Sequence, residues 1–335
     1  MNPFAYQRAE QADAAVHAVS AHGSKFLAGG TNLIDLMKDG VETPSTLVDI
    51  NHIASLQKVE TMPNGGLRLG ALTRNSDVAE HPLVRTNYPL LSQAIFSGAS
   101  PQLRNMASTG GNLMQRTRCA YFMDTGFPAC NKREPGSGCA ALKGFNRMHA
   151  ILGATDEGAT SPHTCIATNP SDMNVALAAL VATVEVQGPN GKREIPFADF
   201  HRLPGNTPEL DTNLKPGELI TAVILPAPLY DHAYYLKVRD RNSYAFALVS
   251  VAAAYKLDGR VIKQAGLALG GVAHKPWRSL EAEHALTGKP PTGESFAKAA
   301  EIALAGAKRY EHNAFKLALA KQSIVRAFTL AGGAA

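Results

Sequence analysis

The chain has 335 residues, of which 45% are hydrophobic and 18% are charged. This apolar content excludes a disordered protein, and the absence of any run of about 18 apolar residues excludes a membrane-spanning helix. The formal net charge is +5 and no run of five Lys or Arg residues occurs, so nucleic-acid binding is not indicated. The length predicts a soluble protein of two or three domains.

Residues 1–55 have the pattern of a small α/β unit. Apolar residues recur at helical spacing over 12–19, and residues 25–28 are typical of a short strand that leads into two glycines. A second helix is predicted over 33–40 and a second strand over 46–50.

The rest of the chain divides at Pro226 and Pro228, which mark a boundary. Before it, the patterns predict strands over 67–71, 184–188 and 218–225 and helices over 89–96 and 170–182. After it, they predict strands over 234–238, 247–255 and 264–269 and helices over 295–308 and 313–329. The final segment is therefore expected to be an α+β domain.

All four cysteines of the chain lie between positions 119 and 165: Cys119, Cys130, Cys139 and Cys165. No two of them have the close spacing that is typical of zinc ribbons. Four thiolates supplied by loops favour an iron-sulfur cluster, whose negative charge nearby cations would offset. Seven basic residues lie between positions 104 and 150: Arg104, Arg116, Arg118, Lys132, Arg133, Lys143 and Arg147. Buried or paired structural cysteines, or a zinc site, remain open alternatives.

Two glycine turns are candidate phosphate sites. The first, Gly29-Gly30, stands between a predicted strand and a predicted helix, and the second is Gly110-Gly111 within Ser108 to Asn112. Consecutive glycines let the backbone approach a ligand, and amides at a helix start can bind phosphate. Neither turn matches the dinucleotide-binding or P-loop pattern, so a turn without a ligand is the alternative at each.

Four segments in this order resemble the flavin subunit of the molybdenum hydroxylases: residues 28–33 (AGGTNL), 99–105 (ASPQLRN), 109–113 (TGGNL) and 169–172 (NPSD). That family includes xanthine dehydrogenase, carbon monoxide dehydrogenase and related aldehyde oxidoreductases, and the resemblance covers essentially the whole chain. In most members the Gly-Gly-Asn segment runs directly into the Ser-Asp segment. Here a four-cysteine insert separates them, and this variant resembles the FAD and 4Fe-4S subunit of bacterial periplasmic aldehyde oxidoreductases.

The resemblance implies an α+β chain of two domains. Residues 1–226 would form a two-part α/β FAD-binding domain of the PCMH (vanillyl-alcohol oxidase-like) type, with lobes 1–55 and 56–226. The second lobe would carry the 4Fe-4S insert at about 115–166. Residues 227–335 would form an α+β domain of the carbon monoxide dehydrogenase flavoprotein C-terminal type.

The resemblance also implies site residues for FAD and for one 4Fe-4S cluster. The FAD contacts would be Phe26, Leu27, Ala28, Gly29, Gly30, Thr31, Asn32, Leu33, Ile34, Ser108, Thr109, Gly110, Gly111, Asn112, Asp172, Ile220 and Lys237. The cluster ligands would be Cys119, Cys130, Cys139 and Cys165. No catalytic residue is expected, and His149, His163 and His274 are expected in surface or packing roles.

The function implied is that of an electron-transfer subunit in a heterotrimer. A large molybdenum-cofactor subunit would oxidise an aldehyde, a small 2Fe-2S subunit would relay the electrons, and FAD would pass them to an external acceptor. The rivals are a self-contained flavin oxidoreductase with structural cysteines and a zinc-stabilised scaffold without flavin. Residues 1–17 lack the pattern of an export signal. The expected location is the periplasm, reached with a signal-bearing partner, and the cytoplasm is the alternative.

Overall fold

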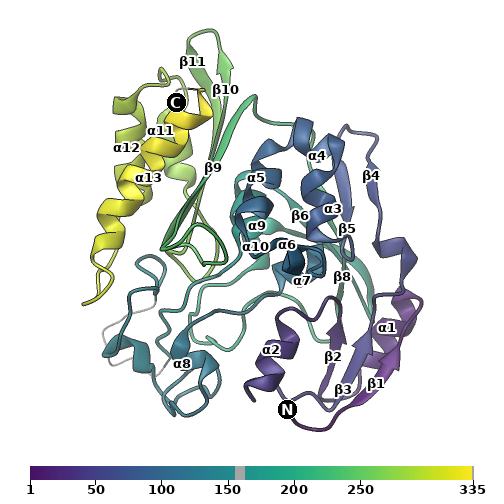
Figure 1. Cartoon of the computed structure of the whole chain (residues 1–335). Coiled ribbons are helices and arrows are strands. Elements are labelled where there is room, and N and C mark those ends of the chain that lie inside the picture. Colours follow the sequence, from purple (N-terminus) through teal and green to yellow (C-terminus); the bar gives the residue numbers. More distant parts are fainter. Residues whose placement is uncertain (155–162, 334–335) are drawn as a thin grey trace.

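The computed structural model describes residues 1–154 and 163–333. At the N-terminal end, β1 (Ala5–Arg8), β3 (Thr46–Asp49) and β2 (Ser24–Leu27) form a parallel sheet in the order β1-β3-β2. Helices α1 (Ala12–Val19) and α2 (Leu33–Lys38) connect and flank these strands (Figure 1). A 3-10 turn, η1 (Ala54–Leu56), leads out of this lobe. The sequence patterns do not predict β1, because all four of its residues are exposed.

The second sheet has five antiparallel strands in the order β4-β5-β8-β6-β7. Their bounds are β4 (Val59–Thr61), β5 (Leu67–Gly70), β8 (Leu219–Leu225), β6 (Thr183–Gly188) and β7 (Gly191–Pro196). The helices of this part are α3 (Asn75–Glu80), α4 (Pro82–Asn87), α5 (Pro89–Ser97), α6 (Pro101–Arg104), α7 (Thr109–Leu113), α9 (Asp172–Ala179) and α10 (Phe197–Phe200). Helices α5 and α9 lie between this sheet and the next one (Figure 1).

The third sheet is antiparallel and has the order β12-β11-β10-β9. It consists of β9 (His232–Val238), β10 (Val249–Asp258), β11 (Val261–Gly270) and β12 (Trp277–Arg278). Helices α11 (Leu280–Leu286), α12 (Gly293–Ala303) and α13 (Phe315–Ala331) cover its outer face. Alternate residues of β10 pack on opposite faces, Val251 and Ala253 toward these helices and Ala252 and Ala254 toward α5 and α9. Both faces are therefore buried, which explains the continuous apolar run.

The segment that contains the cysteines has little regular structure. Its described part holds the short helix α8 (Ala120–Met123) and the 3-10 turn η2 (Ala140–Leu142). Backbone amides of Ile151 and Leu152 donate to the carbonyl of Val272, which fixes this segment to the C-terminal domain. Phe122 packs against Leu36 of α2 and so fixes it to the N-terminal lobe as well.

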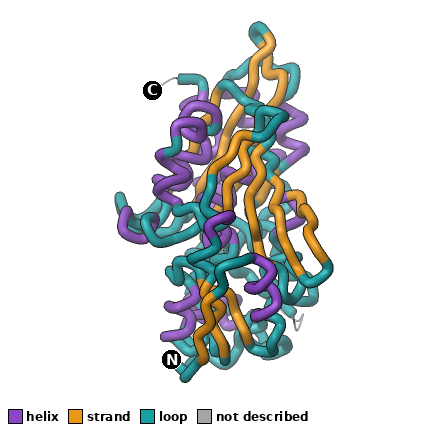
Figure 2. Tube along the Cα trace, turned by 90° about the vertical axis from the view of Figure 1, so that its right-hand side faces the viewer, coloured by secondary structure: helices purple, strands orange, loops and turns teal. Residues whose placement is uncertain are grey.

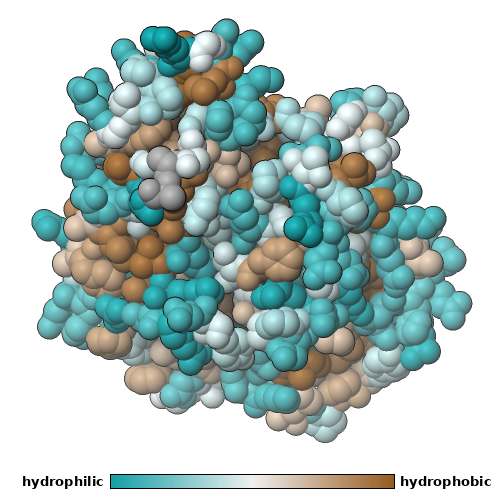
Figure 3. Space-filling view, turned by 45° about the horizontal axis from the view of Figure 1, so that its top comes forward, coloured by the Kyte–Doolittle hydropathy of each residue, from teal (hydrophilic) through white to brown (hydrophobic). Residues whose placement is uncertain are grey.

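The strands extend along the length of the molecule, with the parallel sheet at the N-terminal end (Figure 2). Hydrophilic residues cover most of the face shown in Figure 3, and apolar residues gather there in separate groups. Within residues 1–154 and 163–333, no helix combines the length and the apolar character needed to cross a bilayer.

Candidate functional site

A cavity of about 530 Å³ lies where the two lobes and the C-terminal domain meet, and we call it the central cavity. Its wall includes Thr31 and Asn32 before α2, Gly111 and Asn112 of α7, and Asp172, Lys237 and Arg118. The first turn, the second turn and strand β9 are far apart in the sequence. The fold therefore gathers six of the predicted FAD contacts around one space.

Backbone geometry requires glycine at both positions of the first glycine turn. A Cβ at Gly29 would overlap the carbonyl oxygen of Met106, and Gly30 has φ +72°, a conformation that other residues rarely adopt. The turn places Asn32 at the start of α2, where its Oδ1 accepts a hydrogen bond from the amide of Arg116 at 2.9 Å. Both glycines are thus required by the protein itself, and the next two residues face the cavity.

Hydrogen bonds hold the second glycine turn, which lies in α7, against the start of α9. Ser108 caps α7 by accepting a hydrogen bond from the Gly111 amide at 3.2 Å. Asn112 accepts a 2.6 Å hydrogen bond from the hydroxyl of Ser171, which in turn caps α9 by accepting from the Asn174 amide at 3.0 Å. These bonds fix Gly111 and Asn112 beside the start of α9.

Asp172 and Lys237 form a buried ion pair on the cavity wall. Lys237 Nζ lies 2.8 Å from Asp172 Oδ2, and their side chains are 3% and 8% exposed. Tyr235 donates its hydroxyl to the other carboxylate oxygen at 2.8 Å. Burial, followed by the charge of Asp172, raises the pKa of Tyr235 well above its ordinary value, so this phenol stays protonated. Asp172 belongs to α9 and Lys237 to β9, so both domains supply this pair.

The other predicted FAD contacts do not line the central cavity: Phe26, Leu27, Ala28, Gly29, Gly30, Leu33, Ile34, Ser108, Thr109, Gly110 and Ile220. Thr109 is fully buried and donates to the carbonyl of Thr73 at 3.0 Å. Ile220 is buried in β8, and a Cβ added to Gly110 would lie 3.6 Å from the Cβ of Ile220. As contacts of FAD these residues stay predictions.

Three residues of the cavity wall each carry a buried polar atom that has no hydrogen-bond partner among the described residues: Asn32 Nδ2, Asn75 Oδ1 and Arg118 Nη1. A buried polar group without a partner costs about 1–3 kcal/mol, so proteins rarely leave three around one space. The set contains two donors and one acceptor, and one of the donors is cationic. The cavity therefore has the size and polarity for a large ligand that carries negative charge, as FAD does.

All four cysteines line a second, small cavity, which we call the cysteine cavity. None of them forms a disulfide, so the alternative of paired cysteines is wrong. Cys130 and Cys139 oppose each other in an isolated antiparallel bridge. The described residues contain no cluster of three or more His, Cys, Asp or Glu side chains that could hold a single metal ion.

Cys119, Cys139 and Cys165 are protonated thiols when no metal is bound, because burial raises the pKa of each. Burial raises the pKa of Cys119 to about 12, with a smaller contribution from Cys165 and Cys139 and against the opposing effect of the Phe122 backbone amide. Burial also raises the pKa of Cys165 to about 11, although the charge of Lys132 opposes this shift. Thiolates therefore require a bound cation here.

Most of the basic residues between positions 104 and 150 do not line the cysteine cavity. This corrects the expectation that all seven offset the charge of a cluster. Arg116 pairs with Glu42 at 2.8 Å and with Asp211 at 2.7 Å, and Lys132 pairs with Asp211 at 2.6 Å. Although burial raises the pKa of Asp211, Lys132 and Arg116 hold it well below its ordinary value. Arg147 pairs with Asp240. The acids come from outside the segment, so a local count overestimates its charge; Lys132 alone of these paired cations lines the cysteine cavity.

Of the two roles expected for His149, surface or packing, the structure excludes the surface. This residue is 4% exposed, and its Nε2 lies 3.1 Å from the Sγ of Cys119. Burial and the charge of Lys316 lower its pKa to about 4, so the ring is neutral at pH 7. His274 is buried too, with Nδ1 2.9 Å from the carbonyl oxygen of Arg202. No sequence spacing indicates the contact between Cys119 and His149.

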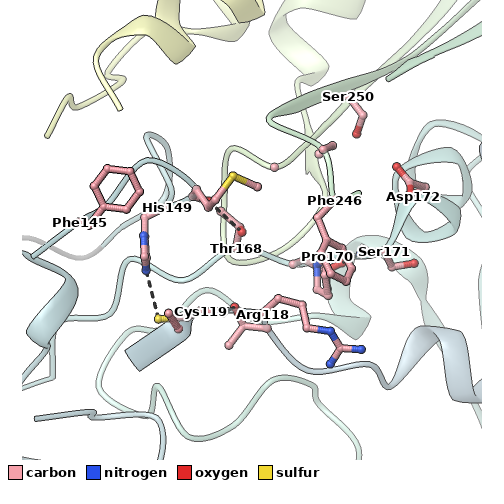
Figure 4. A pocket seen from close by; sticks show the side chains of 17 residues that line it. Arg118, Cys119, Phe145, His149, Thr168, Pro170, Ser171, Asp172, Phe246 and Ser250 are labelled. Atoms are coloured by element: carbon pink, nitrogen blue, oxygen red, sulfur yellow. Dashed lines mark hydrogen bonds between the residues drawn. The ribbon is translucent and has the colours of Figure 1, made fainter. Parts of the chain in front are cut away.

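A third cavity, of about 180 Å³, lies between the other two (Figure 4). It shares Arg118 and Asp172 with the central cavity, and Cys119 and His149 with the cysteine cavity. Figure 4 shows Cys119 and His149 at one side, Asp172 and Ser250 at the other, and Arg118 between them. One peptide bond, Arg118–Cys119, thus joins the walls of both candidate cofactor sites.

Comparisons with known proteins agree over the full length. Residues 2–228 match the FAD binding domain in molybdopterin dehydrogenase, and residues 233–331 match the CO dehydrogenase flavoprotein C-terminal domain. The aldehyde oxidoreductase FAD-binding subunit PaoB of Escherichia coli K12 is 52% identical over 326 residues, which are 97% of this chain and 96% of that protein. The glyceraldehyde dehydrogenase medium chain of Sulfolobus acidocaldarius is 32% identical over 288 residues, 85% of this chain and 82% of that protein.

A solved structure has the same fold. The carbon monoxide dehydrogenase of Hydrogenophaga pseudoflava matches with a TM-score of 0.76 at 25% identity, over 99% of this chain and 98% of that chain. The predicted mixed α/β fold class, with these two domain types, is confirmed. The chain therefore belongs to the molybdenum hydroxylase family, as an oxidoreductase subunit that joins the FAD-binding domain of molybdopterin dehydrogenases to the CO dehydrogenase flavoprotein C-terminal domain.

Proposed function

We propose that this chain is the electron-transfer flavoprotein subunit of a molybdenum-dependent aldehyde oxidoreductase. FAD would occupy the central cavity and one 4Fe-4S cluster the cysteine cavity. The observation that carries the FAD assignment is that six of the predicted FAD contacts, from segments far apart in the sequence, line one cavity of about 530 Å³. Identity of 52% to a subunit named for aldehyde oxidation supports the substrate class.

The residues present fit FAD. When bound, FAD supplies a centre that accepts and passes on electrons. Asn32 and Arg118 would donate hydrogen bonds to its phosphate and sugar oxygens, and Gly111 would let it approach the α7 backbone. The Asp172–Lys237 pair would present one fixed charge of each sign to its polar groups.

The residues around the cysteine cavity fit a 4Fe-4S cluster. It needs four thiolates, each bound to a different iron, and all four cysteines of the chain surround one space. When bound, the cluster supplies one-electron transfer. Lys132 would place a positive charge beside the thiolates, and its own side chain is 1% exposed.

We further propose that the chain works in a heterotrimer with a large molybdenum-cofactor subunit and a small 2Fe-2S subunit. Relatives named as medium chains support this arrangement, because the name implies a larger and a smaller companion. Electrons would arrive from the 2Fe-2S subunit and leave FAD for an external acceptor. The proposed location is the periplasm, reached with an exported partner; fractionation of cells that express all three subunits tests it, and a cytoplasmic complex would contradict it.

A visible spectrum with iron and sulfide analysis tests the cofactors. We expect flavin bands, a broad absorbance near 400 nm, and about four iron and four sulfide per chain. Flavin alone would favour the self-contained flavoenzyme with structural cysteines, and stoichiometric zinc without flavin would favour the scaffold.

Aldehyde turnover tests the division of labour. The purified single chain should not oxidise aldehydes, whereas adding the two partner subunits should couple aldehyde oxidation to acceptor reduction. Aldehyde oxidation by the single chain would contradict the relay.

A further inference from the structure

His149 stands against one cysteine of the candidate cluster site. Its Nε2 lies 3.1 Å from the Sγ of Cys119, within hydrogen-bonding range for sulfur, and Figure 4 shows the ring directed at that atom. The ring is buried, and it lines both the cysteine cavity and the cavity that leads toward Asp172. A histidine ring is therefore in position to act on one candidate ligand of the cluster.

The surroundings of the ring decide which nitrogen carries the proton. Nδ1 is buried and has no hydrogen-bond partner among the described residues. A proton on Nδ1 would therefore make no bond and would leave two lone pairs facing each other at the thiolate. A proton on Nε2 makes an N–H···S bond, and a metal-bound Cys119 thiolate, which has no proton of its own, can only accept it.

The backbone of His149 is held by the C-terminal domain. Lys316 of α13 is fully buried, and its Nζ donates to the carbonyls of His149 at 3.0 Å and Gly271 at 2.7 Å. Asn313 donates its side-chain amide to the carbonyls of His149 and Ala150, both at 3.3 Å. Because two side chains fix the backbone of this short segment, the ring is held beside Cys119.

We propose that His149 is a positioning residue whose Nε2–H donates to the Cys119 thiolate and thereby raises the reduction potential of the cluster; this rests on the proposed 4Fe-4S cluster. Reduction adds one negative charge, which spreads onto the thiolate sulfurs. A donor aimed at one sulfur stabilises the reduced form more than the oxidised form, so the potential rises.

Redox titration followed by electron paramagnetic resonance tests the proposal in the intact complex. His149→Leu removes the donor. We expect the equilibrium constant for reduction of the cluster to fall about tenfold, which lowers its reduction potential by ~59 mV for a one-electron couple. His149→Gln retains an amide donor and should recover part of this shift. The matched control is His201→Gln, since His201 is also buried but contacts the carbonyl of Leu113. Equal potentials in wild type and His149→Leu would overturn the proposal.

A measurement on the wild-type protein does not depend on how the variants fold. With ¹⁵N-labelled histidine, pulsed resonance of the reduced cluster should detect one weakly coupled histidine nitrogen, which persists in His201→Gln. If a protein with full iron and sulfide lacked that coupling, the proposed role of His149 would be overturned, while the proposed cluster would stand. A wild-type protein without iron and sulfide would overturn the proposed cluster itself.

Discussion

The central cavity and the cysteine cavity are built in different ways. Regular elements and their ends contribute much of the wall of the central cavity, including the start of α2, helix α7, the start of α9 and strand β9, and loops complete it. Loops form most of the cysteine cavity, and the surrounding lobes fix those loops through contacts such as those of Phe122 and Ile151. Glycine turns and helix caps have local signals in a sequence, whereas a loop-built cavity reveals only its cysteines.

The largest expected effect is the loss of iron and sulfide, without loss of FAD, when a cysteine of the cysteine cavity is replaced. Cys130→Ser removes a thiolate ligand, so most iron and sulfide should be lost while FAD remains, because no cysteine lines the central cavity. Iron, sulfide and flavin are measured on the same purified sample. Met123→Leu, in the same segment, should retain iron, and full iron in Cys130→Ser would show that this cysteine is not a ligand.

Gly111→Val should have the converse effect. The added side chain would enter the central cavity, with its Cβ 2.9 Å from Ser108 Oγ, so flavin content should fall strongly while iron remains. Flavin fluorescence after denaturation measures the content. Gly293→Val is the matched control, because this glycine also lies in the first turn of a helix, and a Cβ added there would meet no atom within 4 Å outside its chain neighbours and its own helix backbone among the described residues. Equal flavin in both variants would mean that this turn is only structural.

Asp211→Asn should destabilise the loops around the cysteine cavity. It removes the partner of buried Lys132. Breaking a fully buried pair costs about 3–5 kcal/mol of unfolding free energy at pH 7, and because the Asp211 side chain is 25% exposed we expect the lower end of this range. The pKa of Asp211 is lowered in the folded state, so this contribution is complete above its ordinary value of 3.8 and is lost as pH falls through the folded value. Urea unfolding at pH 7 and at low pH checks this. A gap between wild type and variant that does not shrink below about pH 4 would contradict it.

Arg118→Met should have the smallest of these effects. Loss of one charge-assisted hydrogen bond, worth about 1.5–3 kcal/mol, would weaken FAD binding by about 10–100-fold. Titration of the FAD-free protein with FAD measures the affinity. Arg260→Met, on an exposed turn, is the control and should bind FAD like the wild type. Unchanged affinity in Arg118→Met would mean that its guanidinium does not face the cofactor.

The sequence predicts most strands and the longest helices because their signals are local, whereas short helices such as α3, α6 and α10 are missed. The strands over 219–225 and 249–258 stand out through burial of their side chains, and α9 begins at a capping serine. Strand β1 escapes prediction because it is an exposed edge whose pairing with β3 depends on residues 46–49. Hydrophobic patterns report burial, so they cannot report an exposed strand.

In the candidate site, too, the residues with a local sequence signal are predicted and those that depend on distant contacts are missed. Asn112 and Asp172 carry motif signals, and both line the central cavity. Arg118 and His149 have no motif, since their roles depend on which distant residues the fold leaves beside them. The basic segment is misjudged for the same reason, because Glu42 and Asp211 neutralise part of it from afar.

The hydrogen bonds from α13 to the backbone of His149 have a consequence for biosynthesis. Lys316 and Asn313 follow every cysteine in the chain, so they leave the ribosome after all four thiols. Until then, the segment that carries His149 lacks these anchors. The position of the ring beside Cys119 is therefore fixed only after α13 has been synthesised and has packed.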